Sequence, residues 1–252
     1  NLKTLAVTVN EKVCRVQFNR PEAGNSINAQ LVEEFDVITR YCAEAQNGIS
    51  ILLLEGNSEV FSSGGDFNAA ASGNTGPDAA QLYDIWHRMA TGSFVSISLV
   101  EGRVNAGGVG FIAASDIVLA GPSATFGLSE MLFGLFPACV LPFLIRRIGR
   151  QKAHYMTLMT KTLDAQEALS WHLVDQTSDN TALLLRQHLT RLQRLDRQAI
   201  TVYKSYITGI QSDDLQAAKK PAVDANQSMF ANANIQANIK RYVNELKFPW
   251  EA

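Results

Sequence analysis

Two glycine-rich turns are the residues of this chain whose types and spacing first suggest catalysis. They are residues 61–67 (FSSGGDF) and residues 102–110 (GRVNAGGVG), and each follows an apolar stretch. Because glycine carries no Cβ, the backbone N–H groups of such turns can approach a ligand closely. Two N–H groups from two turns, one of them at a helix N-terminus, could form an oxyanion hole. Ordinary tight turns have the same composition, so that alternative stays open.

One glutamate, Glu130 in residues 126–137 (FGLSEMLFGLFP), is the candidate acid or base. A carboxyl group in a low-dielectric pocket can acquire a pKa near neutral pH, which general acid–base catalysis requires. The alternative is a solvated loop glutamate. Neither glycine turn matches GxGxxG or GxxxxGK[ST], so a nucleotide-binding module is a distant interpretation.

Strands and helices must position these turns, and the first half of the chain alternates between the two patterns. Residues 5–9 and 13–18 alternate apolar and polar side chains, as half-buried strands do. Residues 49–54 form a continuous apolar run, which is typical of a strand covered on both faces. Further strands are predicted at residues 94–100 and 116–120. This order predicts an α/β core with parallel pairing.

Helical periodicity begins at residues 28–45, where Asn28 is the expected N-cap, and dominates beyond about Pro142. Asp164 and Glu167 form a capping-box pattern. We predict an α/β core of residues 1–195 and a helical C-terminal region of residues 196–252. Residues 72–77 (SGNTGP) are typical of a loop that could act as a lid. The later predicted helices cover residues 141–148, 151–159, 164–172, 181–195 and a stretch from about residue 213.

The composition is that of an ordinary soluble globular protein: 252 residues, 46% hydrophobic, 18% charged, with a net charge of −2. This balance argues against nucleic acid as the main partner. No apolar run is long enough to cross a bilayer, and no signal peptide is expected. The widely separated Cys14, Cys42 and Cys139 indicate neither a disulfide framework nor a metal site, so we expect a cytoplasmic protein.

Four stretches, in this order, resemble the motifs of one enzyme family. Residues 19–28 (NRPEAGNSIN) resemble the N-terminal signature of the crotonase, or enoyl-CoA hydratase/isomerase, superfamily. Residues 61–67 resemble its first oxyanion turn, residues 102–120 its second, and residues 126–137 its catalytic loop. The resemblance implies an α/β crotonase fold, a spiral of repeated ββα units with a helical C-terminal region that forms trimers or hexamers. It also implies that the N–H groups of Gly65 and Gly107 are the oxyanion donors.

The resemblance also implies which carboxylate is present and which is absent. Classical enoyl-CoA hydratases carry two glutamates; the second corresponds to Glu130, whereas the first falls on Gly110. Ordinary two-carboxylate hydration is therefore in doubt. One carboxylate can still run a syn elimination, in which Glu130 takes the Cα proton and then protonates the departing β-hydroxyl.

Residues 104–108 (VNAGG) and 137–149 (PACVLPFLIRRIG) resemble a subgroup, the dehydratases of polyketide β-branching cassettes. The likeness implies dehydration of 3-hydroxy-3-methylglutaryl-acyl carrier protein to 3-methylglutaconyl-acyl carrier protein. The acyl group would be attached to phosphopantetheine of the carrier protein or to CoA, and no other cofactor is implied. A sister crotonase without a glutamate at the Glu130 position would then decarboxylate the product. The basic residues 145–152 (IRRIGRQK) either dock an acidic carrier protein or end a helix.

Such a substrate is bulky and ends in a carboxylate, and this guides the choice of binding residues. Gly110 would leave space for a β-carbon that bears both methyl and hydroxyl. A helix at residues 79–89 would place Tyr83 and His87 on one face, where one of them could meet the substrate. Asn105 either bonds the substrate or braces its turn, and Trp86 is expected in the pocket wall or the core. The remaining candidates for the binding site are Ala23, Asp66, Phe67, Gly108 and Cys139.

Two of these candidates have a second interpretation. Asp66 is expected to cap the following segment, and Cys139 to be a packed small residue rather than a nucleophile. For the whole chain, two functional alternatives stay beside the dehydratase. One is a generic enoyl-CoA hydratase or isomerase that uses Glu130 alone. The other is a non-catalytic protein that uses the oxyanion-hole N–H groups only to bind an acyl carrier.

Overall fold

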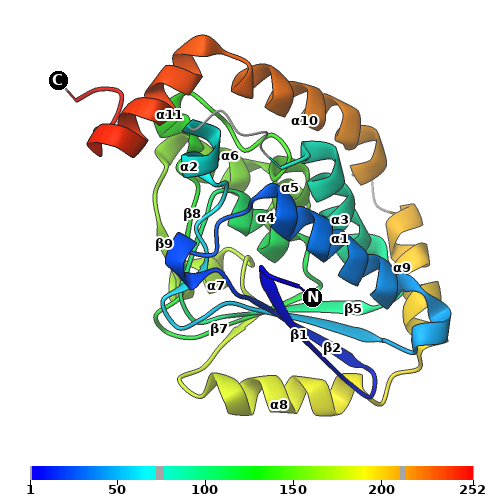
Figure 1. Cartoon of the computed structure of the whole chain (residues 1–252). Coiled ribbons are helices and arrows are strands. Elements are labelled where there is room, and N and C mark those ends of the chain that lie inside the picture. The colour runs from blue at the N-terminus through cyan, green and yellow to red at the C-terminus, as the bar shows by residue number, and fades with distance from the viewer. Residues whose placement is uncertain (1, 72–76, 211–213, 252) are drawn as a thin grey trace.

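The computed structural model describes residues 2–71, 77–210 and 214–251, and these form an α/β fold with two sheets (Figure 1). The predicted lid falls mostly on residues 72–76, which lie outside the described residues. The six-stranded sheet has the order β1 (Leu5–Asn10), β2 (Val13–Phe18), β3 (Ile51–Glu55), β5 (Val95–Val100), β7 (Ile117–Ala120), β10 (Gln176–Thr177). The four-stranded sheet has the order β4 (Val60–Ser62), β6 (Arg103–Asn105), β8 (Thr125–Gly127), β9 (Leu163–Asp164).

Three successive units of the chain each place one strand in each sheet. The pairs β3–β4, β5–β6 and β7–β8 run from the large sheet to the small one, and helical segments follow each pair. Pairing is parallel along β2-β3-β5-β7 and along β4-β6-β8, whereas β1–β2 and β8–β9 are antiparallel. This arrangement confirms the predicted spiral of repeated ββα units.

Helices cover both faces of the large sheet, with α8 on one side and α1, α3, α4 and α5 on the other (Figure 1). The middle strand β3 is therefore buried at every residue, as its continuous apolar run predicts. The helices are α1 (Ala29–Ala43), α2 (Phe67–Ala71), α3 (Ala79–Thr91), α4 (Gly107–Ala114), α5 (Leu141–Ile148), α6 (Arg150–Met159), α7 (Ala165–Ser170), α8 (Thr181–Leu192), α9 (Arg197–Ile210), α10 (Leu215–Phe230) and α11 (Ala233–Glu245), with 3-10 turns η1 (Pro21–Ala23), η2 (Ala45–Asn47) and η3 (Glu130–Phe133).

The predicted helix caps form, one of them in part. The Asn28 side chain accepts a hydrogen bond from Leu31 N–H at 2.9 Å and starts α1. Asp164 accepts from the N–H groups of Gln166 and Glu167 and starts α7. The Glu167 carboxylate pairs with Lys161, so it does not complete the reciprocal half of the capping box.

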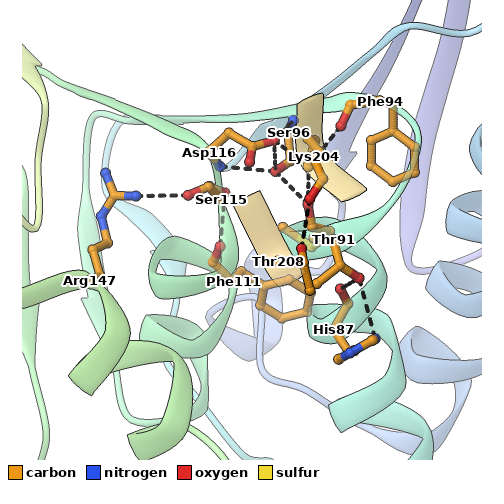
Figure 2. Close-up of polar contacts among 11 residues, drawn as sticks. His87, Thr91, Phe94, Ser96, Phe111, Ser115, Asp116, Arg147, Lys204 and Thr208 are labelled. Carbon is orange, nitrogen blue, oxygen red and sulfur yellow. Dashed lines mark hydrogen bonds and ion pairs between the residues drawn. The ribbon is translucent and has the colours of Figure 1, made fainter. Parts of the chain in front are cut away.

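The helix α9 lies within the predicted helical region of residues 196–252, although the sequence analysis gave it no bounds of its own, and a buried lysine bonds it to the core (Figure 2). Lys204 Nζ donates to Asp116 Oδ2 at 2.6 Å and to the carbonyl oxygens of Met89 and Phe94 at 3.0 and 2.9 Å. Burial lowers the pKa of Lys204, and the Asp116 carboxylate opposes that change. Residues 196–252 thus begin with a helix bonded into the same chain's core; the boundary at 195/196 stays a prediction.

Candidate active site

The candidate active site lies where three neighbouring parallel strands of the small sheet end. Gly65 follows β4, Gly107 follows β6, and Glu130 follows β8. Because parallel neighbours present their carboxyl ends at the same edge, the two glycine turns and the glutamate come together there. The sequence pattern placed the two glycine turns after residues 49–54 and 94–100, whereas in the structure the short, unpredicted strands β4 and β6 stand between. The pairing of β4, β6 and β8 supplies the proximity of the two turns and Glu130.

The two glycine turns touch, which brings their N–H groups close. The backbone nitrogen of Gly65 lies 3.9 Å from the position that a Cβ on Gly107 would occupy. Gly64 has a φ of +92°, and a Cβ there would lie 2.6 Å from the Cβ of Ala106, so this contact needs glycine. Ala106 has a φ of 49°, an uncommon value for alanine, and its N–H donates to Gly127 O at 2.9 Å.

The Gly107 N–H belongs to the first turn of α4, where backbone N–H groups lack a helical acceptor and carry partial positive charge. Gly65 is exposed at its turn, and the residues on either side of it bond to Ile27: Ile27 N–H donates to Gly64 O, and Asp66 N–H donates to Ile27 O. The geometry therefore suits two N–H groups directed at one oxygen.

Glu130 begins η3 and carries the carboxyl group of this site. The residue as a whole is half-buried, but its Oε2 is out of contact with solvent and has no hydrogen-bond partner among the described residues. Burial raises the pKa of Glu130 to about 7, against the opposing effect of backbone N–H groups of Glu130 and Ser129. This value suits a group that both takes and returns a proton near neutral pH.

A cavity of about 830 Å³ joins these groups, a size typical of sites for small organic ligands. Its lining contains Gly65, Gly107 and Glu130, and also Ile27, Leu82, Trp86 and Val140. Three further candidates from the sequence also line it, namely Asp66, Phe67 and Cys139. The candidates outside the lining are Ala23, Tyr83, His87, Asn105, Gly108 and Gly110.

Asp66 and Cys139 have the structural contacts that the sequence suggested. Asp66 accepts from Ala69 N–H at 3.0 Å, which caps α2, and pairs with Arg20 at 3.2 Å. Cys139 Sγ lies 3.6 Å from Ala222 O, and burial raises the pKa of this thiol to about 11. A neutral thiol is a weak nucleophile, so Cys139 is part of the wall rather than a reacting group.

Tyr83 and His87 share a helix face as predicted, but the structure places both outside the cavity lining. Tyr83 is fully buried, and its hydroxyl donates to Leu215 O at 2.6 Å, which ties α3 to α10. His87 lies on α3 beside Thr91, whose hydroxyl donates to the His87 carbonyl oxygen at 2.8 Å (Figure 2). The expectation that one of the pair meets the substrate is not met by this geometry.

The space expected above Gly110 is not free. A Cβ on Gly110 would lie 2.3 Å from Cζ2 and 2.6 Å from Cε2 of Trp86, so the indole fills this volume. The prediction that Gly110 leaves room for the substrate is therefore wrong: the glycine makes room for tryptophan. Gly108 likewise serves packing, because a Cβ there would lie 2.9 Å from Ser62 O.

Asn105 braces the site rather than lining it, which is one of the two interpretations left open by the sequence. Its Nδ2 donates to Ser129 Oγ at 2.9 Å, directly before Glu130. Ala23 ends η1 and is half-buried, away from the lining. In the basic cluster of residues 145–152, Arg147 stabilises the fold, because it donates to Ser115 O at 2.7 Å (Figure 2). It also pairs with Asp175 at 2.6 Å.

Sequence reasoning missed one side of the cavity, which the C-terminal helices supply. The helices α10 and α11 contribute Asn226, Gln227, Phe230, Gln236, Ile239 and Lys240 to the lining. Lys240 and Gln236 are exposed, so this side is polar and open to solvent. Their amphipathic pattern predicts helices but carries no sign of which helix face meets a cavity formed around 100 residues earlier in the chain.

The three cysteines are buried free thiols, and no group of His, Cys, Asp or Glu in the described part of the chain is arranged to hold a metal ion. Over the same residues, no helix is both long and apolar enough to cross a membrane. The candidate reacting groups in the cavity lining are the N–H groups of Gly65 and Gly107 and the Glu130 carboxyl group. Together they can polarise a carbonyl oxygen and move a proton on the adjacent carbon.

Comparison with known proteins agrees with this geometry. The family description "Enoyl-CoA hydratase/isomerase" matches residues 8–252. The bacillaene synthase dehydratase PksH of Bacillus subtilis is 46% identical, with 99% of this chain and 97% of that protein covered. The 2,3-dehydroadipyl-CoA hydratase of Escherichia coli is 30% identical, with 86% of each chain covered.

The crystal structure of a polyketide biosynthesis enoyl-CoA hydratase, pksH of Bacillus subtilis, superposes with a TM-score of 0.94 at 45% identity, covering 99% of this chain and all of that one. These findings confirm the predicted crotonase fold and the likeness to polyketide dehydratases. The matching proteins are named as a dehydratase and as hydratases, which add or remove water, and this chain is an enzyme of the same hydro-lyase class. The chain belongs to the enoyl-CoA hydratase/isomerase family.

Proposed function

We propose that this enzyme removes water from a 3-hydroxy-3-methylglutaryl group on an acyl carrier protein and releases the 3-methylglutaconyl-carrier protein. The observation that carries the proposal is the carboxyl group of Glu130, whose Oε2 atom is buried without a hydrogen-bond partner among the described residues, in the same cavity as the two candidate N–H donors. The position of a second carboxylate, Gly110, is covered by an indole instead. The other carboxylates of the lining are engaged: Asp66 pairs with Arg20, and Asp78 caps α3.

In the proposed reaction, the thioester carbonyl oxygen accepts hydrogen bonds from the N–H groups of Gly65 and Gly107. The Glu130 carboxylate takes a proton from Cα, and the C–H electron pair moves onto the carbonyl oxygen as an enolate. The enolate collapses, the Cα=Cβ bond forms, and the Cβ–O bond breaks. The departing hydroxide takes the proton from Glu130 and leaves as water, which restores the carboxylate. No metal is required, because the two donors stabilise the developing charge.

The relatives support the setting of this reaction. PksH is named as a dehydratase of bacillaene synthase, so we propose a polyketide pathway for this chain also. The acyl group would arrive on the phosphopantetheine arm of an acyl carrier protein, past the polar side of the cavity near Lys240. A sister crotonase would then decarboxylate the product.

A homotrimer or hexamer is the proposed assembly. Exposed apolar side chains on α6 and η3 support it, because a face of this kind is normally covered in an oligomer; they are Met131, Tyr155, Leu158 and Met159.

The test is to incubate the protein with 3-hydroxy-3-methylglutaryl-carrier protein and to follow the intact carrier by mass spectrometry. We expect the loss of one water, abolished in Glu130→Gln and retained in Glu59→Gln, a matched change at an exposed turn. Further loss of carbon dioxide without a second enzyme would contradict the proposal that a sister crotonase carries out the decarboxylation. An unchanged carrier, together with rapid hydration of crotonyl-CoA, would refute the carrier-bound substrate.

A further inference from the structure

Two buried polar atoms of the cavity residues have no hydrogen-bond partner among the described residues: Glu130 Oε2 and Trp86 Nε1. An unsatisfied buried donor costs roughly 1–3 kcal/mol, so such an atom in a folded protein calls for an explanation. The proposed proton transfer explains Glu130. No step of that reaction uses the indole N–H of Trp86.

The indole packs against Gly110 through its six-membered ring. Its Cζ2, Cη2 and Cε2 atoms lie 2.3, 2.5 and 2.6 Å from the position of a Cβ on Gly110, so this ring, and not the N–H, faces the glycine. The ring is 1% exposed and makes edge contacts with Phe111 and Phe143, at centroid distances of 5.7 and 5.9 Å. The direction of the N–H is therefore set by packing. A side chain free to rotate would instead find an acceptor elsewhere.

An indole N–H only donates, and it does not titrate in the working range of the enzyme, so it needs an oxygen acceptor and cannot act as acid or base. A 3-hydroxyacyl thioester offers two oxygens near the reacting carbons. In the proposed mechanism the carbonyl oxygen accepts hydrogen bonds from Gly65 and Gly107. The β-hydroxyl oxygen is therefore the acceptor that remains for the indole N–H. A donor at this oxygen also stabilises the charge that develops as the Cβ–O bond breaks.

We infer that Trp86 Nε1–H binds the β-hydroxyl oxygen of the substrate and holds it toward Glu130. This inference rests on the proposed function. It makes Trp86 a residue that selects hydroxylated over non-hydroxylated acyl groups, and it gives Gly110 a purpose, since any side chain there would displace the indole. The product lacks the hydroxyl, so it loses this bond and its release is favoured.

The test compares pantetheine thioesters of 3-hydroxy-3-methylglutarate and of 3-methylglutarate, which differ only in the hydroxyl group. Glu130→Gln protein prevents turnover, and ¹⁵N-tryptophan labelling reports on its three indoles, Trp86, Trp171 and Trp250. We expect the hydroxylated ligand to move the Trp86 indole proton downfield and to bind about tenfold more tightly. Trp86→Phe, which keeps an aromatic wall without the N–H, should bring the two affinities within about twofold of each other.

Equal affinities for the two ligands with Trp86 present, equal movement of its resonance, or no binding of either ligand would overturn the inference. If Trp86→Phe does not fold, Trp171→Phe and Trp250→Phe assign the remaining indole signal, and the ligand-induced movement decides the question. A hydroxyl preference without dehydration by the unmutated enzyme would refute the proposed function alone. Dehydration without any hydroxyl preference would refute the role of Trp86 alone.

Discussion

Replacing Glu130 by glutamine should stabilise the folded protein above neutral pH while it removes the proposed base. Folding raises the pKa of Glu130 from its ordinary 4.5 to about 7, because the carboxylate is costly to ionise inside the cavity. One pKa unit corresponds to about 1.4 kcal/mol, so a charged Glu130 costs the folded state about 3 kcal/mol.

The sign of this effect follows from the raised pKa. The protonated form favours folding, so its contribution is fully present below pH 4.5 and is lost as the pH rises through 7. Glutamine does not titrate and avoids that loss. The variant should therefore match the unmutated protein at the acidic end and exceed its unfolding free energy by about 3 kcal/mol at pH 8.

Urea unfolding of both proteins at pH 5 and pH 8, at one protein concentration, measures this difference. Glu59→Gln is the matched control, since Glu59 is exposed, and its unfolding free energy should follow that of the unmutated protein at both pH values. A Glu130→Gln difference that is the same at pH 5 and pH 8 would refute the assignment of a raised pKa. A variant that is less stable at pH 8 would show that the carboxylate has a cationic or hydrogen-bonding partner.

Four further results are expected. The kcat/KM for dehydration should rise about tenfold per pH unit below pH 7 and level off above it, because Glu130 must be ionised to take the proton; a flat pH–rate profile would contradict this. Gly65→Pro, which removes the N–H, should lower kcat/KM by about 10²–10³, whereas Gly65→Ala, whose Cβ meets nothing within 4 Å, should retain activity in the same assay. Lys204→Met should lower the unfolding free energy in urea by about 3–5 kcal/mol with kcat retained, because Asp116 and two carbonyl oxygens lose a buried partner. Tyr83→Phe should lower the unfolding free energy in urea by about 1–3 kcal/mol and leave kcat and KM unchanged, because only the hydrogen bond to Leu215 is lost. A raised KM would show that Tyr83 contacts the substrate.

Local signals in the sequence were sufficient for the elements with strong periodicity. The strand at residues 13–18 and the helix at residues 141–148 were predicted to the residue, and Asn28 caps α1 as expected. The short strands β4, β6 and β8 have three residues each, too few for an alternation to be visible. The sequence therefore predicted none of these three strands, and it placed the two glycine turns directly after the longer strands that became β3 and β5.

The helix α9 shows why a helix inside the predicted helical region of residues 196–252 received no bounds from the sequence. Its sequence, RQAITVYKSYITGI, is rich in β-branched and aromatic residues, which have modest helix propensity. Its central buried residue is Lys204, a residue type that ordinarily marks a solvent-facing position. The position favours a lysine only because three acceptors surround it: the carbonyl oxygens of Met89 and Phe94 and the carboxylate of Asp116. All three lie far from Lys204 in the sequence.

The sequence by itself determined the α/β core, the pair of glycine turns and the glutamate beyond them, because these depend on local conformation and on the order of motifs along the chain; the resemblance to a family added the repeated ββα units. The tertiary structure alone decided which side chains face the cavity. Trp86 covers Gly110, Tyr83 turns away to Leu215, and Lys240 reaches the lining from α11. The direction of a side chain depends on contacts between segments that are distant in the sequence. Helical periodicity predicts that a helix has an apolar face, but it does not predict which segment that face contacts.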